Sequence, residues 1–483
     1  MSASTGPGLL RFADSRDVPW TGRLYIRNWS TNHSGNGPDR IFVGASAQAL
    51  TPSQINRIVF ITPSGLPSDY FAALTASGEL VPAGVHDYDY VVTNGTVTIT
   101  RYTGPGGNIT VPSAIENLPV TVIGNRAFDP AFEDITSLTS VTLPDTLTDI
   151  GEEAFHYCKG LTNINLGNGV LRIGYRAFSD CDKLSAIIIP ASVREIGDVL
   201  FESSNNLLAI TVHPNNLFFS SLDGVLFDKT QTRIIQFPLG RAGAYAVPET
   251  VRSIEDGAFY ACYYLSNVTL SASVTNIGDF AFQFCVGLTN ITIQEGVRTI
   301  GGSAFFHCLS LTSITLPDSL TSVGALAFQQ SGLIRAEIGR GVASFGGWHF
   351  FAYSPNLAGV YFRGDAPQVF WDFHDSTPNV TVYYLPGTLG WGATYAGRPT
   401  APWYRPNPVI LAFGPSFGVR ANAFGFSISW ATNANVIVEA SINLNGQSNW
   451  SPVSTHSLTS GFSYFTDPQW TNYANRFYRL RAP

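Results

Sequence analysis

The residues best suited to covalent chemistry in this chain are its five cysteines, one of which, Cys308, directly follows His307. An imidazole can activate a thiol as a nucleophile, but a working pair also needs a third group that orients the base. No such group recurs here, and neighbouring residues in an extended or turn segment point apart. Each cysteine instead stands three residues after a phenylalanine, at Cys158, Cys181, Cys262, Cys285 and Cys308.

Serine takes the same place in two copies, at Ser204 and Ser331. The exchange of cysteine for serine indicates a position selected for small volume rather than for thiol chemistry, so we interpret the cysteines as an inert structural ladder. Neighbouring strands of a parallel array lie about 4.8 Å apart, within the Cα separation that a disulfide spans. The redox state of the cysteines therefore stays open.

Other candidates for chemistry are sparse. The eight histidines show no metal-ligand spacing. Asp372, His374 and Asp375 form a compact acid–imidazole group, and a loop with local hydrogen bonding is favoured there over a catalytic or metal site. The sequence contains no His-Glu-x-x-His and no phosphate-binding loop. We therefore expect no catalytic residue, no metal and no cofactor.

The cysteines belong to a repeat whose usual step is 23 residues. An Ile-Gly-like pair recurs through the middle of the chain, and an Ala-Phe pair follows it at a fixed offset. A fixed period of this length is typical of a stacked array, because one unit cannot bury its apolar side alone. The first residue of the recurring pair is Ile123, Ile150, Ile173, Ile196, Ile254, Ile277, Ile300 or Val323.

Each repeat predicts one short strand followed by turns. In the copy that begins at Leu311, Ile314 and Leu316 alternate with polar residues, as a half-buried strand requires. Pro317 ends the strand because proline cannot donate to a strand ladder. The Ala-Phe-x-x-Cys segment predicts a helical turn or a 3₁₀ segment. The expected product is mainly β: a right-handed parallel coil with one strand per rung on a continuous face.

This unit resembles the BspA-type bacterial leucine-rich repeat, whose pattern runs roughly L-x-x-I-x-L-P-x-x-V-x-x-I-G-x-x-A-F-x-x-C. The resemblance covers about residues 86–386. Residues 92–128 look like the β cap with which such arrays begin, and residues 378–403 look like their closing segment. The resemblance implies adhesion or protein–protein interaction, and the lack of convergent reactive groups favours a non-enzymatic protein at the cell surface or outside the cell.

We predict four parts along the chain. Residues 1–85 form an N-terminal β-rich or α+β module, in which Thr51-Pro52-Ser53-Gln54 has the spacing of a capping box. Residues 86–398 form the solenoid, with a hairpin insertion at about 213–248 around Asp228-Lys229-Thr230-Gln231. Residues 399–406 form a proline-rich linker, and residues 407–483 form a β-sandwich-like module.

Two surfaces are candidate binding sites. Outward positions on the strands form a neutral face that suits a protein or glycan partner, although threonine is also simply favoured on exposed strands. A cluster of aromatic residues near the end of the array is either a hydrophobic cap or a sugar-binding platform. The face comprises Thr142, Asn165, Thr211, Thr269, Thr292, Thr315, Arg335, Glu337 and Tyr361, and the aromatic patch comprises Trp348, Phe351, Tyr353 and Trp371.

Composition excludes several partners. Charged residues make up 13% of the chain and the net charge is −7, so neither a nucleic-acid footprint nor a basic membrane patch is expected. No apolar stretch is long enough to predict membrane insertion. The first twenty residues hold no export signal, so a cytoplasmic location stays open beside a surface or extracellular one. We expect a secreted or surface binding protein. The alternatives are a structural subunit of an extracellular layer or filament and a carbohydrate-directed lectin or enzyme accessory protein. The oligomeric state stays open.

Overall fold

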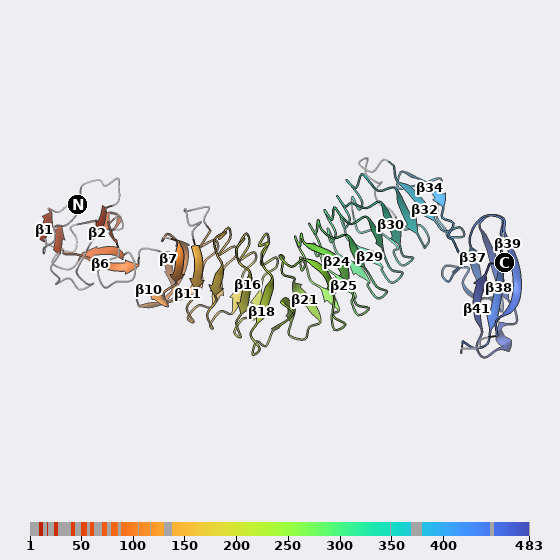
Figure 1. The fold of residues 1–483 in the computed structure, drawn as a ribbon, viewed down its shortest axis with the longest axis horizontal. Coiled ribbons are helices and arrows are strands. Elements are labelled where there is room, and N and C mark those ends of the chain that lie inside the picture. The colour runs from red at the N-terminus through yellow and green to blue at the C-terminus, as the bar shows by residue number, and fades with distance from the viewer. Residues whose placement is uncertain are drawn as a thin grey trace. The chain divides into compact units, whose positions relative to one another are not determined.

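The computed structural model describes residues 9–12, 17, 24–27, 40–43, 50–55, 58–61, 70–74, 79–85, 88–104, 106–115, 117–129, 138–347, 349–368, 379–444 and 449–482. The chain forms two compact units, Met1–Lys229 and Thr230–Pro483. Strands dominate both units (Figure 1). Helix is confined, among the described residues, to α1 (Pro52–Ile55) and the 3₁₀ segment η2 (Trp470–Asn472). The predicted mainly β fold class is confirmed.

The first unit begins with a six-stranded mixed sheet. The Thr51 N–H donates to Gln54 Oε1 at 2.7 Å and the Gln54 N–H donates to Thr51 Oγ1 at 3.3 Å. This reciprocal pair satisfies donors that the first turn of α1 leaves unpaired. The order of the sheet is β1 (Leu9–Phe12), β3 (Arg40–Val43), β6 (Glu79–Val85), β5 (Tyr70–Leu74), β4 (Ile58–Ile61) and β2 (Leu24–Arg27).

Parallel strands from successive coils build the solenoid part of the first unit. Residues 23 apart in the sequence face each other, as in the pairs Ser140–Asn163 and Asp149–Arg172. We call the outward surface of the first strand row the strand face. That row contains β9 (Gly107–Thr110), β12 (Leu138–Thr142), β14 (Asn163–Asn165), β16 (Ala186–Ile189) and β18 (Ala209–Val212). The second row contains β7 (Tyr88–Thr93), β8 (Thr96–Tyr102), β11 (Leu118–Ile123) with β10 (Ala114–Ile115) beside it, β13 (Asp149–Ile150), β15 (Arg172–Ile173) and β17 (Glu195–Ile196).

The second unit repeats this arrangement with two strand rows of its own. Its strand face is carried by β22 (Gly243–Ala246), β24 (Leu265–Thr269), β26 (Asn290–Thr292), β28 (Ser313–Thr315), β30 (Arg335–Ile338), β31 (Gly359–Phe362), β32 (Thr381–Tyr384) and β34 (Arg398–Pro402), which also pairs with β33 (Thr394–Tyr395). Its second row is β21 (Arg233–Gln236), β23 (Ser253–Ile254), β25 (Asn276–Ile277), β27 (Thr299–Ile300) and β29 (Ser322–Val323).

The Ala-Phe segments are turns, so the prediction of a helical or 3₁₀ conformation is wrong. Two residues per segment adopt positive φ, as Glu153 (52°) and Tyr157 (59°) do on either side of Phe155. Left-handed residues break a helix. The N–H groups of Glu153 and Tyr157 donate to Tyr175 O and Ser179 O of the next coil at 2.9 Å and 3.1 Å, and the Phe155 N–H between them donates to Ala177 O at 2.9 Å. The turns thus add a third ladder between coils.

Stacked phenylalanines fill the core of each unit. In the first unit the rings of Phe128 and Phe155 lie 4.8 Å apart between centroids. In the second unit the rings of Phe282, Phe305 and Phe328 follow one another at 5.2 Å and are within 2° of parallel. Such pairs stabilise a fold by about 0.5–1.5 kcal/mol each beyond the burial of their area. The repeat phenylalanine therefore serves as the shared spine of the coils.

A hairpin follows β18, inside the predicted insertion at about 213–248. β19 (Phe219–Leu222) pairs antiparallel with β20 (Val225–Asp228) around Asp223 and Gly224. Both turn residues have positive φ, 49° and 76°, as a two-residue hairpin turn with the twist of its strands requires. The Asp-Gly pair carries the sequence signal for this turn, and the predicted stretch 228–231 lies at the turn that follows β20.

The predicted linker is partly wrong, because residues 399–402 belong to β34 of the solenoid. Pro399 and Pro402 lack N–H groups, but their neighbours supply the bonds: Thr400 N–H donates to Ala393 O at 3.1 Å and Trp403 N–H donates to Tyr384 O at 2.7 Å. Prolines at these places do not interrupt the pairing. The solenoid therefore extends to about residue 403.

Two antiparallel sheets form the C-terminal part of the second unit. Their inner faces share a buried cluster to which Phe426, Ile428 and Phe465 contribute from one sheet, and Val436, Val438 and Leu458 from the other. The first sheet holds β35 (Val409–Leu411), β36 (Gly418–Arg420), β37 (Ala423–Ser429) and β40 (Phe462–Asp467), and the second holds β39 (Ser451–Leu458), β38 (Ala434–Ser441) and β41 (Phe477–Arg481).

Candidate functional site

The five cysteines, all of which the structure describes, are free and buried. Burial raises the pKa of each thiol, and raises that of Cys285 to about 12. Thiols with such pKa values stay protonated at neutral pH and are poor nucleophiles. His307 directs its Nδ1 at Gln330 Oε1, 3.0 Å away, while Cys308 Sγ donates to Phe282 O at 3.2 Å. The adjacent thiol and imidazole therefore do not interact.

The hydrogen bonds of this column give the cysteine position a chemical role that volume alone does not explain. Cys181 Sγ donates to the carbonyl oxygen of Phe155 in the preceding coil at 3.3 Å, and Cys285 Sγ donates to Phe259 O at 3.0 Å. Ser204 Oγ makes the equivalent bond to Phe178 O at 2.8 Å. Cysteine and serine interchange because both are small and both donate, which corrects the volume-only interpretation.

Acid–imidazole chemistry finds little support among the described residues. His156 lies between Asp129 Oδ2 at 3.1 Å and Asp180 Oδ2 at 3.5 Å, on neighbouring coils. Within the described ranges no group of three or more His, Cys, Asp or Glu side chains is placed to hold a metal ion. Asp372, His374 and Asp375 lie outside the described residues.

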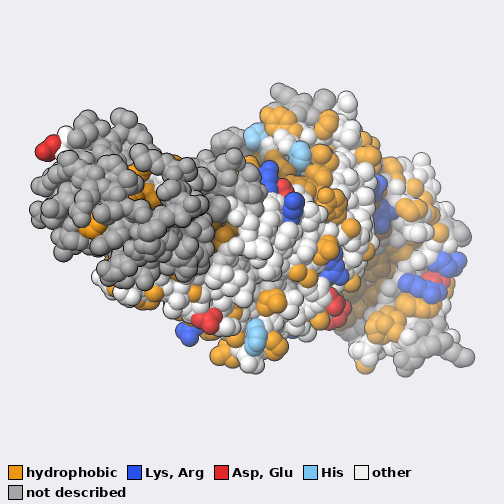
Figure 2. Space-filling view, turned by 60° about the vertical axis from the view of Figure 1, so that its left-hand side comes forward, with side chains coloured by type: hydrophobic (Ala, Val, Ile, Leu, Met, Phe, Trp, Pro, Cys, Tyr) orange, Lys and Arg blue, Asp and Glu red, His pale blue; other side chains and the backbone are white. Residues whose placement is uncertain are grey.

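The residues predicted for the binding face share the outward side of the strand rows. Thr142 pairs with Asn165 in the first unit, and Thr269 with Thr292 in the second. Asn165, Thr211, Thr269, Thr292 and Thr315 are exposed, and Thr142 is half-buried. Amide ladders run between coils beside them, as in the 3.0 Å bond from Asn290 Nδ2 to Asn267 Oδ1. Figure 2 shows how sparse charged side chains are on the part of the surface that it presents.

At β30, β31 and β32 the neutral ladder gives way to arginine and aromatic side chains. Thr315, Glu337, Tyr361 and Tyr383 follow one another across the strand register. The rings of Tyr361 and Tyr383 stack at 4.5 Å, and the Arg335 guanidinium lies 3.7 Å from the centroid of Tyr361 on the same stack. We call the set Arg335, Tyr361, Tyr383, Trp403 and Arg405 the arginine–aromatic cluster.

Contacts from outside the strand row complete the cluster. The Trp403 ring lies edge-on to Tyr361 at 5.1 Å, and Arg405 lies 4.9 Å from the centroid of Trp403. Gly359 makes room for the stack, because a Cβ there would lie 2.7 Å from Tyr361 Cε2. Arg335 and Tyr361 were predicted from the sequence, whereas Tyr383 and Trp403 were not. In the segment "TVYYLP" the alternation of strand residues places Tyr383 on the outward side, and this pattern could have identified it. The sequence around Trp403 holds no comparable pattern.

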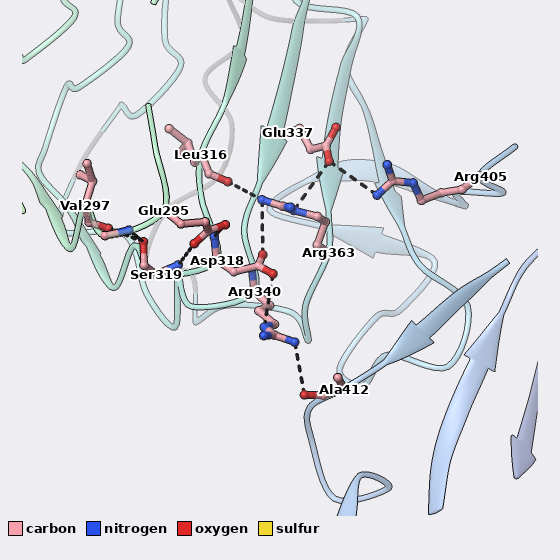
Figure 3. Close-up of polar contacts among 11 residues, drawn as sticks. Glu295, Val297, Leu316, Asp318, Ser319, Glu337, Arg340, Arg363, Arg405 and Ala412 are labelled. Carbon is pink, nitrogen blue, oxygen red and sulfur yellow. Dashed lines mark hydrogen bonds and ion pairs between the residues drawn. The ribbon is translucent and has the colours of Figure 1, made fainter. Parts of the chain in front are cut away.

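A network of ion pairs lies beside the cluster (Figure 3). Arg363 Nη2 donates to Leu316 O at 2.7 Å and lies 3.3 Å from Asp318 Oδ1, and its Nε lies 3.6 Å from Glu337 Oε1. Arg405 approaches the same Glu337 oxygen at 3.9 Å. Arg340 pairs with Asp318 at 3.4 Å and also donates to Ala412 O at 3.2 Å. Glu337 is therefore held between arginines and is a structural member of the face, not a free acid.

The predicted aromatic patch does not form one surface in the part that is described. Phe351 is only 3% exposed and its ring lies 5.8 Å from that of Phe328 in the core, as expected for a hydrophobic cap and not for a sugar-binding platform. Tyr353, at 49%, is exposed. The difference follows from the repeat, in which Phe351 takes the place of the spine phenylalanine. Trp348 and Trp371 lie outside the described residues.

The model of the BspA type leucine rich repeat region matches residues 121–246 and 243–358. Among solved structures, the chain is similar to the pneumococcal vaccine antigen PcpA, with 20% identity over 62% of this chain and 92% of that one and a TM-score of 0.49. It is also similar to a leucine-rich cell surface protein from Faecalibacterium prausnitzii (26% identity, 59% of this chain and 96% of that one, TM-score 0.35) and to a leucine-rich repeat protein from Bacteroides ovatus (21%, 62% and 70%, 0.40).

No curated protein sequence is significantly similar to the chain. Among the described helices, none has the length and apolar character needed to cross a bilayer. The matched repeats coincide with the coils that carry the phenylalanine spine and the strand face. This chain is a BspA-type leucine-rich repeat protein.

Proposed function

We propose that this protein is a non-enzymatic binding scaffold at the bacterial surface or outside the cell, and that the strand face of its second unit docks a protein partner. The observation that carries the proposal is the arginine–aromatic cluster. The surface location is supported by the description of the Faecalibacterium prausnitzii relative as a cell surface protein. The finer role would be adhesion through that partner.

The composition of the cluster suits a contact region between proteins. Tyr, Trp and Arg are enriched among the interface residues whose loss weakens binding most. Arg335 and Tyr361 are half-buried and already stacked at 3.7 Å, so they would lose little side-chain freedom on binding. The exposed threonines beside the cluster add neutral hydrogen-bonding groups, which are typical of the polar rim around such a centre.

A partner can be sought by quantitative affinity capture on wild-type protein and on the variant Trp403→Ala, followed by titration of each purified candidate. We expect Trp403→Ala and Arg335→Ala to weaken binding of the true partner at least tenfold, since removal of a central aromatic or arginine anchor typically costs about 2 kcal/mol or more. Thr269→Ala, on the same face away from the cluster, is the matched control. A partner that binds Trp403→Ala and Thr269→Ala equally well would contradict the proposal.

A second candidate, a structural subunit that assembles with its own copies, has one specific observation in its favour. Exposed apolar side chains gather around the hairpin of the first unit: Leu217 is 75% exposed, and Ile188, Phe218 and Leu222 are also exposed. Such patches favour association. Light scattering should then show a mass that rises with concentration in the wild type but not in Leu217→Ser/Phe218→Ser. A constant monomer mass for the wild type would exclude this role.

A further inference from the structure

Two adjoining hollows lie on the C-terminal sandwich of the second unit, beside the last coils of the solenoid. Their volumes are about 280 Å³ and 470 Å³. They share Pro415, Ser416 and Tyr464, and we call them together the junction groove. Pockets of roughly 300–1,000 Å³ are the usual size for small ligands, and interfaces between domains are a common place for them.

The solenoid and the sandwich meet closely at this groove. Arg340 of the solenoid donates from Nη1 to Ala412 O at 3.2 Å, which anchors the 411–416 segment that forms one wall (Figure 3). A Cβ at Gly387 would lie 3.2 Å from Leu411 Cδ1 and 3.3 Å from Phe462 Cβ. Because these surfaces are already in contact, the groove is preformed.

A flat aromatic wall stands over a floor of small side chains. On the outer side of the sheet, β37 contributes Gly425 and Ser427, and β40 contributes Phe462 and Tyr464, with Tyr464 opposite Ser427 in the register. A Cβ at Gly425 would come within 2.4 Å of Tyr464 Oη, so the glycine lets the phenol ring lie across the floor. Phe462 is 44% exposed and Tyr464 41% exposed. Large aromatic faces are thus open to solvent.

Polar groups are placed at both ends of this wall. Asp365 comes from the solenoid, and its Oδ1 accepts the Leu389 N–H at 2.7 Å, which fixes the carboxylate at the groove. Ser427 Oγ donates to Ser416 Oγ at 3.0 Å along the groove. Arg420 lines the other hollow. An acceptor, two hydroxyls and a cationic donor therefore surround one aromatic surface.

We propose that the junction groove binds a glycan, with a sugar ring against Tyr464 and its hydroxyls bonded to Asp365 and Arg420. A pyranose has an apolar face of C–H groups, which packs on an aromatic ring, and a rim of hydroxyls, which both donate and accept. The groove offers partners for both surfaces. A free phosphate is disfavoured by the Asp365 carboxylate, and an extended peptide would need an open strand edge, whereas the groove lies over a sheet face.

The test uses the full chain on an array of neutral and sialylated oligosaccharides, followed by calorimetric titration of the strongest responder. We expect Tyr464→Ala and Asp365→Ala to weaken binding at least tenfold, and Tyr464→Phe to retain most of it because the ring remains. Tyr264→Ala is the matched control, since Tyr264 is an exposed tyrosine (52%) on the solenoid of the same unit and should bind as the wild type does. Circular dichroism melting of each variant establishes that it is folded.

Three outcomes would overturn the assignment. These are no oligosaccharide bound at millimolar concentration, equal affinity of Tyr464→Ala and Tyr264→Ala, and binding of extended peptides instead of glycans with the same dependence on Tyr464. The arginine–aromatic cluster is a separate surface, so Arg335→Ala should leave glycan binding unchanged. The glycan site and the protein-docking strand face can therefore fail independently.

Discussion

Replacing Cys285 tests whether the repeat cysteine is a hydrogen-bond donor or only a filler. Its thiol is fully buried and donates to Phe259 O at 3.0 Å. Phe259 O also accepts the Cys262 N–H at 3.2 Å, so Cys285→Ala removes one of its two hydrogen bonds, which costs about 0.5–1.5 kcal/mol. The mutation also removes a buried atom, whose loss costs about 1 kcal/mol more. We therefore expect the free energy of unfolding to fall by about 1.5–2.5 kcal/mol. Cys285→Ser keeps the donor and should cost less than about 1 kcal/mol.

Cys262 provides the matched control within the same column. It is equally buried, but its thiol makes only a long contact of 3.9 Å with Tyr260 O. Cys262→Ala should therefore cost only the lost packing, about 1 kcal/mol. Urea unfolding followed by circular dichroism measures all three variants, with an unchanged denaturant slope showing that the comparison is valid. The donor interpretation is refuted if Cys285→Ser is as unstable as Cys285→Ala, or if Cys262→Ala costs as much as Cys285→Ala.

Three further outcomes are expected. The native chain should show no fast-reacting thiol toward a disulfide reagent at pH 8, because burial raises the pKa of all five cysteines; denaturation should release five, and a single fast thiol before unfolding would contradict this. Phe280 has φ of 58°, so Phe280→Gly should be more stable than Phe280→Ala by about 1 kcal/mol, whereas a helical turn would give the opposite sign. The pKa of Glu439 is lowered by hydrogen bonds from Arg481 and Arg479. Its contribution to stability is therefore present above the pKa of an unfolded glutamate, about 4.3, and disappears as the pH falls through the lower folded value. The double variant Arg479→Gln/Arg481→Gln should make acid unfolding of the sandwich less steep, and an unchanged acid profile would argue against the pairing.

Much of the solenoid could be predicted because its information is periodic and local. The alternation at Ile314 and Leu316, and the spacing of Phe282, Phe305 and Phe328, require a coil of fixed length with a shared spine. The Ala-Phe turns were misjudged because their positive φ values are stabilised by bonds to the next coil, such as that from Tyr157 N–H to Ser179 O. Residues other than glycine rarely adopt positive φ because the conformation is sterically unfavourable. Here the backbone carbonyl groups of the neighbouring coil accept hydrogen bonds that stabilise it.

By itself the sequence determined the repeat, its family and the outward row of threonines, since the 23-residue period repeats one local pattern many times. Only the tertiary structure decided the sites. Trp403 lies against Tyr361, and Asp365 lines the same groove as Tyr464, although no periodic signal connects either pair. The first contact forms where the chain closes the solenoid, and the second where the solenoid meets the sandwich. A repeat pattern specifies how one coil packs on the next, and carries no information about what packs where the repetition stops.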